Sequence, residues 1–182
     1  MDVGNFDTSN VTGMNSLFSN DIKLTNLDVS SWDTSNVKDM KWTFYNNQKL
    51  TNLNVSSWDT SNVTTMYQMF HQNYALTKLD VSNWNTSKVT NMYGMFTNCS
   101  GLNTLDLGSW DTSKVKTMYQ MFYWNRSLTE LDLSNWNTSS VTGMFEMFRN
   151  DGKLKTIYAS DSFVTSQVSN STNMFYSNAQ LI

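Results

Sequence analysis

Acidic side chains recur in this sequence at one fixed interval. Asp80, Asp106 and Asp132 are 26 residues apart, Asp28 occupies the same repeat position upstream, and Asn54 fills the position between Asp28 and Asp80. On neighbouring strands such side chains would lie about 4.8 Å apart, where like charges repel. Hydroxyl neighbours, a basic partner or a bound cation would relieve that repulsion. Solvated carboxylates with hydroxyl partners are the favoured interpretation. Calcium is a minor alternative, because no compact loop collects the roughly six or more oxygens that it prefers.

Residue types that carry catalysis or hold metals are scarce. His71 is the only histidine and Cys99 is the only cysteine. No Ser-His triad, His-based metal cluster or intramolecular disulfide is therefore expected. Cys99 falls in a column that is otherwise Asn or Asp, which predicts a side chain that hydrogen-bonds the adjacent coil from a return bend. The sequence thus predicts no catalytic residue, no metal site, no cofactor and no enzyme activity.

The segment that positions these side chains is a repeat. Trp58 recurs at the 26-residue interval in four further units, and Val63 recurs in the same way. A fixed period of this size is typical of a solenoid. In the first half of a unit, Leu27-Asp28-Val29 alternates apolar and polar residues, which predicts a strand with one buried face. One such strand in each unit predicts a single parallel sheet.

The second half of each unit has a different spacing of apolar residues. Val63, Met66, Met69 and Phe70 fall largely on one side of a helix. The preceding Asp59-Thr60-Ser61 supplies oxygens that could cap the first helical turn. We therefore expect an α/β solenoid of 26-residue strand-turn-helix coils with one parallel sheet.

The repeats predict one domain over residues 1–182. Met1-Asp2-Val3 occupies the positions of Leu27-Asp28-Val29, so the first coil is expected to be partial from residue 1. The last unit, from about 152 to 182, departs from the template and is interpreted as a capping coil. The whole is interpreted as a fragment of a larger surface protein.

Residues that break the repeat on exposed positions are the candidates for binding a partner. On the outer face of the predicted sheet, one column changes identity and charge in every coil and lies beside the acidic column. Variation on a regular face is typical of a binding surface, and also of neutral drift. The sheet-face candidates are Asn26, Asp28, Asn52, Asn54, Lys78, Asp80, Thr104, Asp106, Glu130 and Asp132.

Aromatic residues that break the template form the second candidate surface. Trp42 stands where other units have Ser, Gln, Gly or Glu, and Trp124 stands where others have Asn or Gln. Exposed flat rings can stack on sugars or anchor a protein partner, although contact with a flanking domain or cover for the coil would also explain them. The aromatic candidates are Trp42, Tyr45, Tyr74, Tyr123 and Trp124.

Charge and hydrophobicity narrow the classes of partner. The formal net charge is −3, and its 12 basic residues form no cluster that could follow a phosphate backbone. No apolar run of about 18 residues is present. We therefore expect neither nucleic-acid binding nor membrane insertion, and we expect an extracellular protein or glycan ligand.

The motif LTxLDxSxWDTSxVTxMxxMF resembles the BspA-type leucine-rich-repeat proteins of bacterial cell surfaces. The resemblance extends over nearly the whole chain, from repeats such as Leu50 to Phe70 to the closing Leu154-Lys155-Thr156-Ile157. It implies a leucine-rich-repeat solenoid on a secreted or wall-attached protein, with a non-catalytic adhesion function. The alternative is a structural spacer without its own ligand. Two features depart from the family: Cys follows the Met-Phe pair only at Cys99, and no anchoring motif is present.

Overall fold

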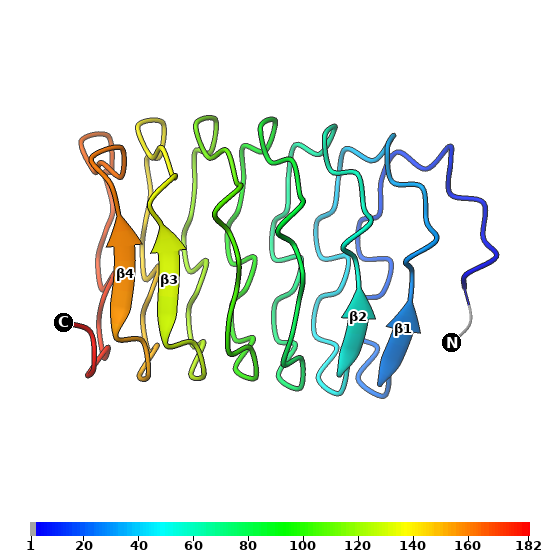
Figure 1. Cartoon of the computed structure of the whole chain (residues 1–182), viewed down its shortest axis with the longest axis horizontal. Coiled ribbons are helices and arrows are strands. Elements are labelled where there is room, and N and C mark those ends of the chain that lie inside the picture. Colours follow the sequence, from blue (N-terminus) through cyan, green and yellow to red (C-terminus); the bar gives the residue numbers. More distant parts are fainter. Residues whose placement is uncertain (1–2) are drawn as a thin grey trace.

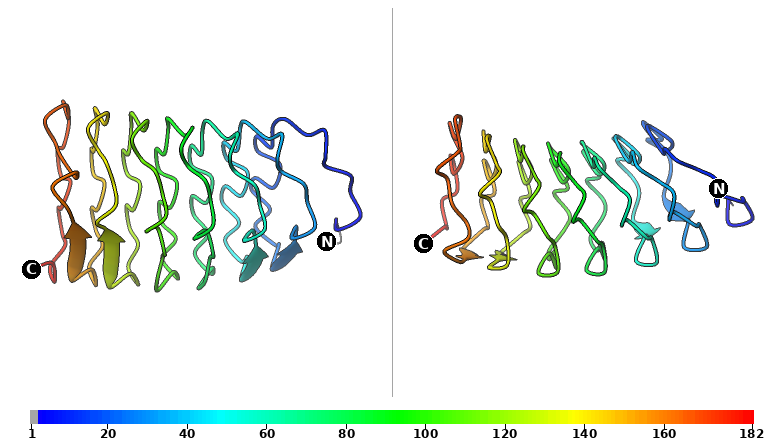
Figure 2. Two further views of the ribbon diagram at one scale, coloured as in Figure 1. Left: turned by 45° about the horizontal axis from the view of Figure 1, so that its top comes forward. Right: turned by 90° about the horizontal axis from the view of Figure 1, so that it is seen from above.

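The computed structural model describes residues 3–182 as a single row of stacked coils. Figure 1 shows the coils side by side along the long axis, with the chain ends at opposite ends of the row. In the right-hand view of Figure 2, the strands lie along one side of the stack and the remainder of each coil lies along the other. Met1 and Asp2, which were expected to begin a partial first coil, lie outside the described residues.

Four short strands form on one side of the stack. They are β1 (Asn26–Asp28), β2 (Asn52–Asn54), β3 (Glu130–Leu133) and β4 (Thr156–Ala159). β1 pairs with β2 and β3 pairs with β4, in both cases in parallel. Parallel pairing was predicted, but these are two separate two-stranded sheets, so the prediction of one continuous sheet is wrong.

A longer column of parallel bridges joins the coils on the opposite side. It runs from Gly13 through every coil to Asn170. Alternate N–H groups in this half donate to the next coil: Met66 bonds the Asn91 carbonyl at 3.0 Å, and Phe70 bonds the Met95 carbonyl at 2.9 Å. The backbone groups that a helix would use internally therefore connect neighbouring coils.

The predicted helices do not form, so the strand-turn-helix, leucine-rich-repeat fold class is wrong. No helix occurs anywhere in residues 3–182. Two backbone positions in each coil, four residues apart, have positive φ, as Gln68 at 50° and Gln72 at 61° show. A right-handed helix needs negative φ at every residue, so a left-handed residue at this interval interrupts it. Turns such as the one closed from Met69 N–H to the Met66 carbonyl reproduce helical spacing without a helix.

Aromatic ladders fill the core between the two sides. The Phe rings of successive coils stack with centroids 5.4 to 5.9 Å apart, from Phe18 to Phe175. Each Trp of the repeat is buried and donates its indole N–H to the preceding coil, as Trp84 does to the Val55 carbonyl at 3.0 Å. The Trp and Met-Phe columns of the repeat therefore form the core of the stack.

From Thr34 to Thr138, the Thr of the Asp/Asn-Thr-Ser triplet has a role other than the predicted helix cap. Thr60 is buried, and its hydroxyl donates to the Asn85 carbonyl of the next coil at 3.0 Å. Asp59 accepts a hydrogen bond from the Ser61 N–H at 2.9 Å, which closes a local Asx turn. The triplet therefore stabilises a bend and ties it to the following coil.

Candidate functional site

The sheet-face candidates are all exposed along the strand side of the stack. β1, β2 and β3 carry six of them, and Lys78, Asp80, Thr104 and Asp106 lie on the coils between β2 and β3. Buried leucines alternate with these positions, as in the exposed-buried-exposed pattern of β1. The variable column therefore faces solvent, as the alternation in the sequence predicted. Binding of a partner by this face stays a prediction.

The acidic column is stabilised within each coil. Asp28 accepts hydrogen bonds from the Ser30 hydroxyl at 2.7 Å and from the Ser30 N–H at 3.0 Å. Asp80 makes the same two contacts with Ser82. These hydrogen bonds hold the pKa of both carboxyl groups below the usual range, so the groups stay ionised. The bond from the serine hydroxyl lowers the pKa most, and the bond from the serine N–H adds to it. Serine hydroxyls thus supply the expected relief from repulsion at Asp28 and Asp80, whereas Asp106 accepts the Gly108 N–H at 3.2 Å.

The sheet face carries two shallow hollows. One of about 370 Å³ lies over β1 and β2 and includes Asn26, Asp28 and Asn52. The other, of about 360 Å³, includes Asp106, Glu130, Asp132 and the exposed ring of Tyr158. Within residues 3–182, no three His, Cys, Asp or Glu side chains come together as a metal site.

Two of the aromatic candidates meet in a hollow on the opposite half of the stack. Trp42 and Tyr45 line a hollow of about 310 Å³ between the first coils. Both rings are half-buried. Sequence reasoning did not single out the polar side chains that share this hollow, which are Ser16, Ser19, Asn20 and Gln68.

Trp42 is held in place by the next coil. Its indole N–H donates to the Gln68 side-chain oxygen at 2.9 Å, and its ring meets Tyr67 edge to face at 5.3 Å. The backbone of Trp42 is left-handed, with φ of 55°. A bulky residue in this conformation costs roughly 1–2 kcal/mol relative to the ordinary region. Ser16 and Gly94 occupy the equivalent positions in other coils.

Tyr45 belongs to a short aromatic row beside this hollow. It stacks on His71 with ring centroids 4.9 Å apart. Burial lowers the pKa of His71 to about 4, so the ring is neutral at physiological pH. Tyr74 is half-buried, and burial followed by the proximity of Tyr45 raises its pKa. The structure therefore brings Trp42, Tyr45 and Tyr74 to one region.

Tyr123 and Trp124 form a separate pair several coils away. Their rings stack at 5.9 Å, and the Arg126 guanidinium lies 4.4 Å from the Trp124 centroid. Trp124 is also left-handed, with φ of 65°. A cation over the ring covers one of the faces that a ligand would use. The five aromatic candidates thus divide into two groups, and the first borders a hollow that several polar side chains also line.

The return-bend column behaves as predicted. Asn73 is buried and donates to the Phe44 carbonyl of the preceding coil at 2.8 Å. The Cys99 thiol makes the equivalent contact with the Phe70 carbonyl at 2.9 Å. Burial raises the pKa of Cys99 to about 12, which keeps the thiol protonated.

Comparison with known families gives matches over residues 1–79 and 72–181. Both are to the family described as "Mycoplasma protein of unknown function, DUF285". The chain belongs to this family. Two overlapping matches in one chain agree with the repeated coils seen in the structure. No curated protein matches the chain. Residues 3–182 contain no helix that is long and apolar enough to cross a membrane.

Proposed function

We propose that this chain is a non-catalytic adhesion module of a secreted or cell-wall-attached bacterial surface protein. Its ligand would be a host or matrix glycan or protein that lies along one side of the stack. The finer resemblance, to BspA-type surface proteins, is part of the same proposal and rests on the Trp-Asp-Thr-Ser and Met-Phe motifs. Membership of the DUF285 family is compatible with this proposal and does not assign it.

The hollow at Trp42 and Tyr45 is the observation that carries the proposal. Two rings that break the repeat converge there with hydroxyl and amide groups from Ser16, Ser19 and Asn20. An aromatic face packs against the C–H groups of a sugar ring, while hydroxyls and amides bond the sugar's own hydroxyls. Binding sites commonly combine apolar walls with a few converging polar groups in this way.

The backbone at Trp42 supports the same interpretation. Equivalent positions carry Ser16, Gly94, Glu146 or amide side chains, which are smaller or more flexible than an indole. The hydrogen bond to Gln68 recovers part of the cost. A bulky ring retained in a strained position is a recognised sign of a functional site. Trp124 shares this backbone conformation, but Arg126 covers its ring, so the polar hollow is what distinguishes Trp42.

A glycan array and a panel of matrix proteins, each screened with and without calcium, test the proposal. Trp42→Ser should weaken the strongest interaction at least about tenfold, since a central aromatic contact commonly contributes more than about 1.4 kcal/mol. Serine fits the backbone, because Ser16 has φ of 59° at the same repeat position. Trp124→Ser is the matched control and should leave binding unchanged.

Three results would contradict this assignment. Equal loss in both variants, or none in either, would remove the hollow as the binding site. If the wild-type chain binds nothing on either panel, the alternative function as a structural spacer would replace adhesion.

A further inference from the structure

The two ends of the stack expose complementary halves of the contact that joins coils internally. At the amino-terminal end, the carbonyl groups of the first coil face outward. Across residues 3–182, the following four carbonyls accept no hydrogen bond, although their equivalents in every later coil, the last included, do: Gly13, Asn15, Leu17 and Ser19.

The last coil presents the matching donors. Four of its N–H groups correspond to those of Met144, Glu146, Phe148 and Asn150, which all donate to the last coil. Within the described part of the chain, the four corresponding N–H groups of the last coil donate to no acceptor. They belong to Ser171, Asn173, Phe175 and Ser177. Donors and acceptors alternate at the same spacing, so one end can continue the ladder of the other.

One backbone pair runs in the opposite direction and also matches. Inside the stack, the Thr64 N–H donates backward to the Lys38 carbonyl at 2.9 Å. The Thr12 N–H and the Ser169 carbonyl are the equivalent groups at the two ends, and neither has a backbone partner among residues 3–182. Each unpaired donor of this ladder at one end therefore has a matching unpaired acceptor at the other end.

Side chains at the ends are complementary too. Phe175 is 48% exposed, whereas Phe148, its equivalent one coil earlier, is fully buried. At the other end, Phe6 and Leu17 border an apolar cavity of about 660 Å³ that also reaches Phe18. Phe175 on one molecule and Phe18 on another would extend the ring ladder by one step.

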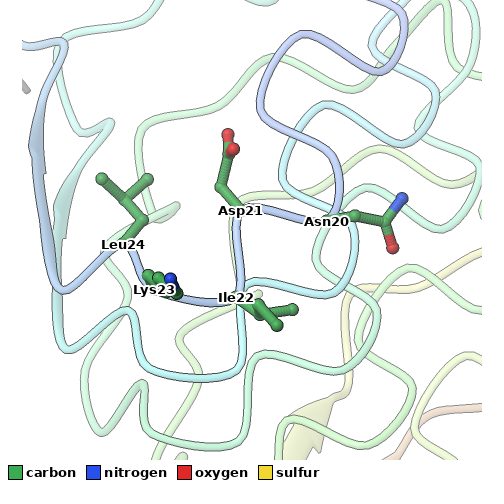
Figure 3. Close-up of a pocket in the computed structure, with 5 residues that line it drawn as sticks. All are labelled: Asn20, Asp21, Ile22, Lys23 and Leu24. Atoms are coloured by element: carbon green, nitrogen blue, oxygen red, sulfur yellow. The ribbon is translucent and has the colours of Figure 1, made fainter.

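The first return bend supplies a further matching group. Figure 3 shows the bend from Asn20 to Leu24, with the side chains of Asn20 and Asp21 pointing in different directions. Inside the stack, an N–H in this column donates to the side chain one coil later, as Asp151 does to the Asn178 oxygen at 3.0 Å. The Asn178 N–H at one end and the Asp21 carboxylate at the other would make the next such bond.

We propose that this chain binds a second copy of itself end to end, with the last coil of one molecule stacked on the first coil of the next. The contact is heterologous, because it joins two different surfaces, and the stack does not close on itself. Assembly therefore continues as an open row whose length rises with protein concentration. Unpaired backbone edges promote such pairing.

Sedimentation velocity of the whole chain over a wide concentration range tests the proposal. We expect the average mass to rise above that of one chain as concentration increases. Leu17→Glu blocks the amino-terminal end and Phe175→Glu blocks the carboxy-terminal end, so each variant alone should remain a monomer. Asn103→Glu adds the same charge on an exposed middle coil and should assemble like the wild type.

Mixing the two blocked variants gives the sharpest result. Each variant keeps the end that the other lacks, so an equimolar mixture should form a dimer and nothing larger. Wild-type monomers at every concentration, or a mixture that stays monomeric, would overturn the proposal. Tyr176→Glu repeats the carboxy-terminal test if Phe175→Glu lowers the melting temperature, because Tyr176 is 56% exposed.

Discussion

Asp151 occupies a return-bend position where neighbouring coils carry Asn. One of its carboxylate oxygens accepts the Asn125 N–H at 2.7 Å, and the other is buried without a partner within residues 3–182. Asn125 fills the same position one coil earlier by donating to the carbonyls of Phe96 and Phe122. A carboxylate cannot donate in this way. Burial raises the pKa of Asp151 well above its ordinary value, which favours the protonated acid.

Asp151→Asn should therefore stabilise the fold, by about 1–3 kcal/mol at pH 7, because a donor replaces an unsatisfied buried oxygen. The folded pKa is raised, so the folded state binds more protons than the unfolded state. The contribution of Asp151 to stability is then fullest below about pH 4 and is lost as pH rises through the folded pKa, so the gain from Asp151→Asn should be larger at pH 7 than at pH 4. Urea unfolding at pH 4 and pH 7 measures both effects.

Asp21→Asn is the matched control for this prediction. Asp21 lies in the same column at the open end of the stack and is exposed. Its substitution should change the unfolding free energy by less than about 0.5 kcal/mol. A stabilisation that is equal at pH 4 and pH 7 would show that ionisation of Asp151 does not matter.

The two halves of each coil differed in how far the sequence determined them. Leu27 and Val29 alternate with polar residues, so the exposed and buried faces of the first half could be predicted. In the second half, turns place Met66, Met69 and Phe70 at helical spacing, so periodicity alone predicted the wrong element. A better signal was present. Asn, Gln, Ser or Gly dominate two positions per coil, and such residues commonly tolerate a left-handed backbone.

A β-branched residue distinguishes the observed coil from a helix. Gln72 has φ of 61° and no side-chain hydrogen bond in the described chain. Gln72→Val should lower the unfolding free energy by about 1–2 kcal/mol, because a branched side chain clashes in this conformation. In a helix the same change would cost well under about 1 kcal/mol.

Asn103→Val provides the comparison for this element. Asn103 is exposed, and its backbone φ is not positive. Its substitution should stay within about 0.5 kcal/mol of the wild type in the same urea titration. Similar small effects for both variants would contradict a left-handed position at residue 72.

At the scale of the whole molecule, the repeat determines stability and its exceptions determine surface chemistry. The buried Trp and Phe ladders follow the 26-residue interval, and their role could be predicted from the sequence alone. The candidate aromatics could be singled out because they break that interval. Their division into two groups could not be predicted, because it depends on which neighbours share a hollow with Trp42 and which cation covers Trp124.

Adhesion by the intact stack tests the central claim most directly. Beads coated with equal amounts of wild-type chain, Trp42→Ser or Trp124→Ser would be counted on cultured host cells and on immobilised matrix after washing. We expect adhesion by wild-type and Trp124→Ser beads, and at least about a tenfold loss for Trp42→Ser beads. Undiminished adhesion of the Trp42→Ser beads would contradict that claim.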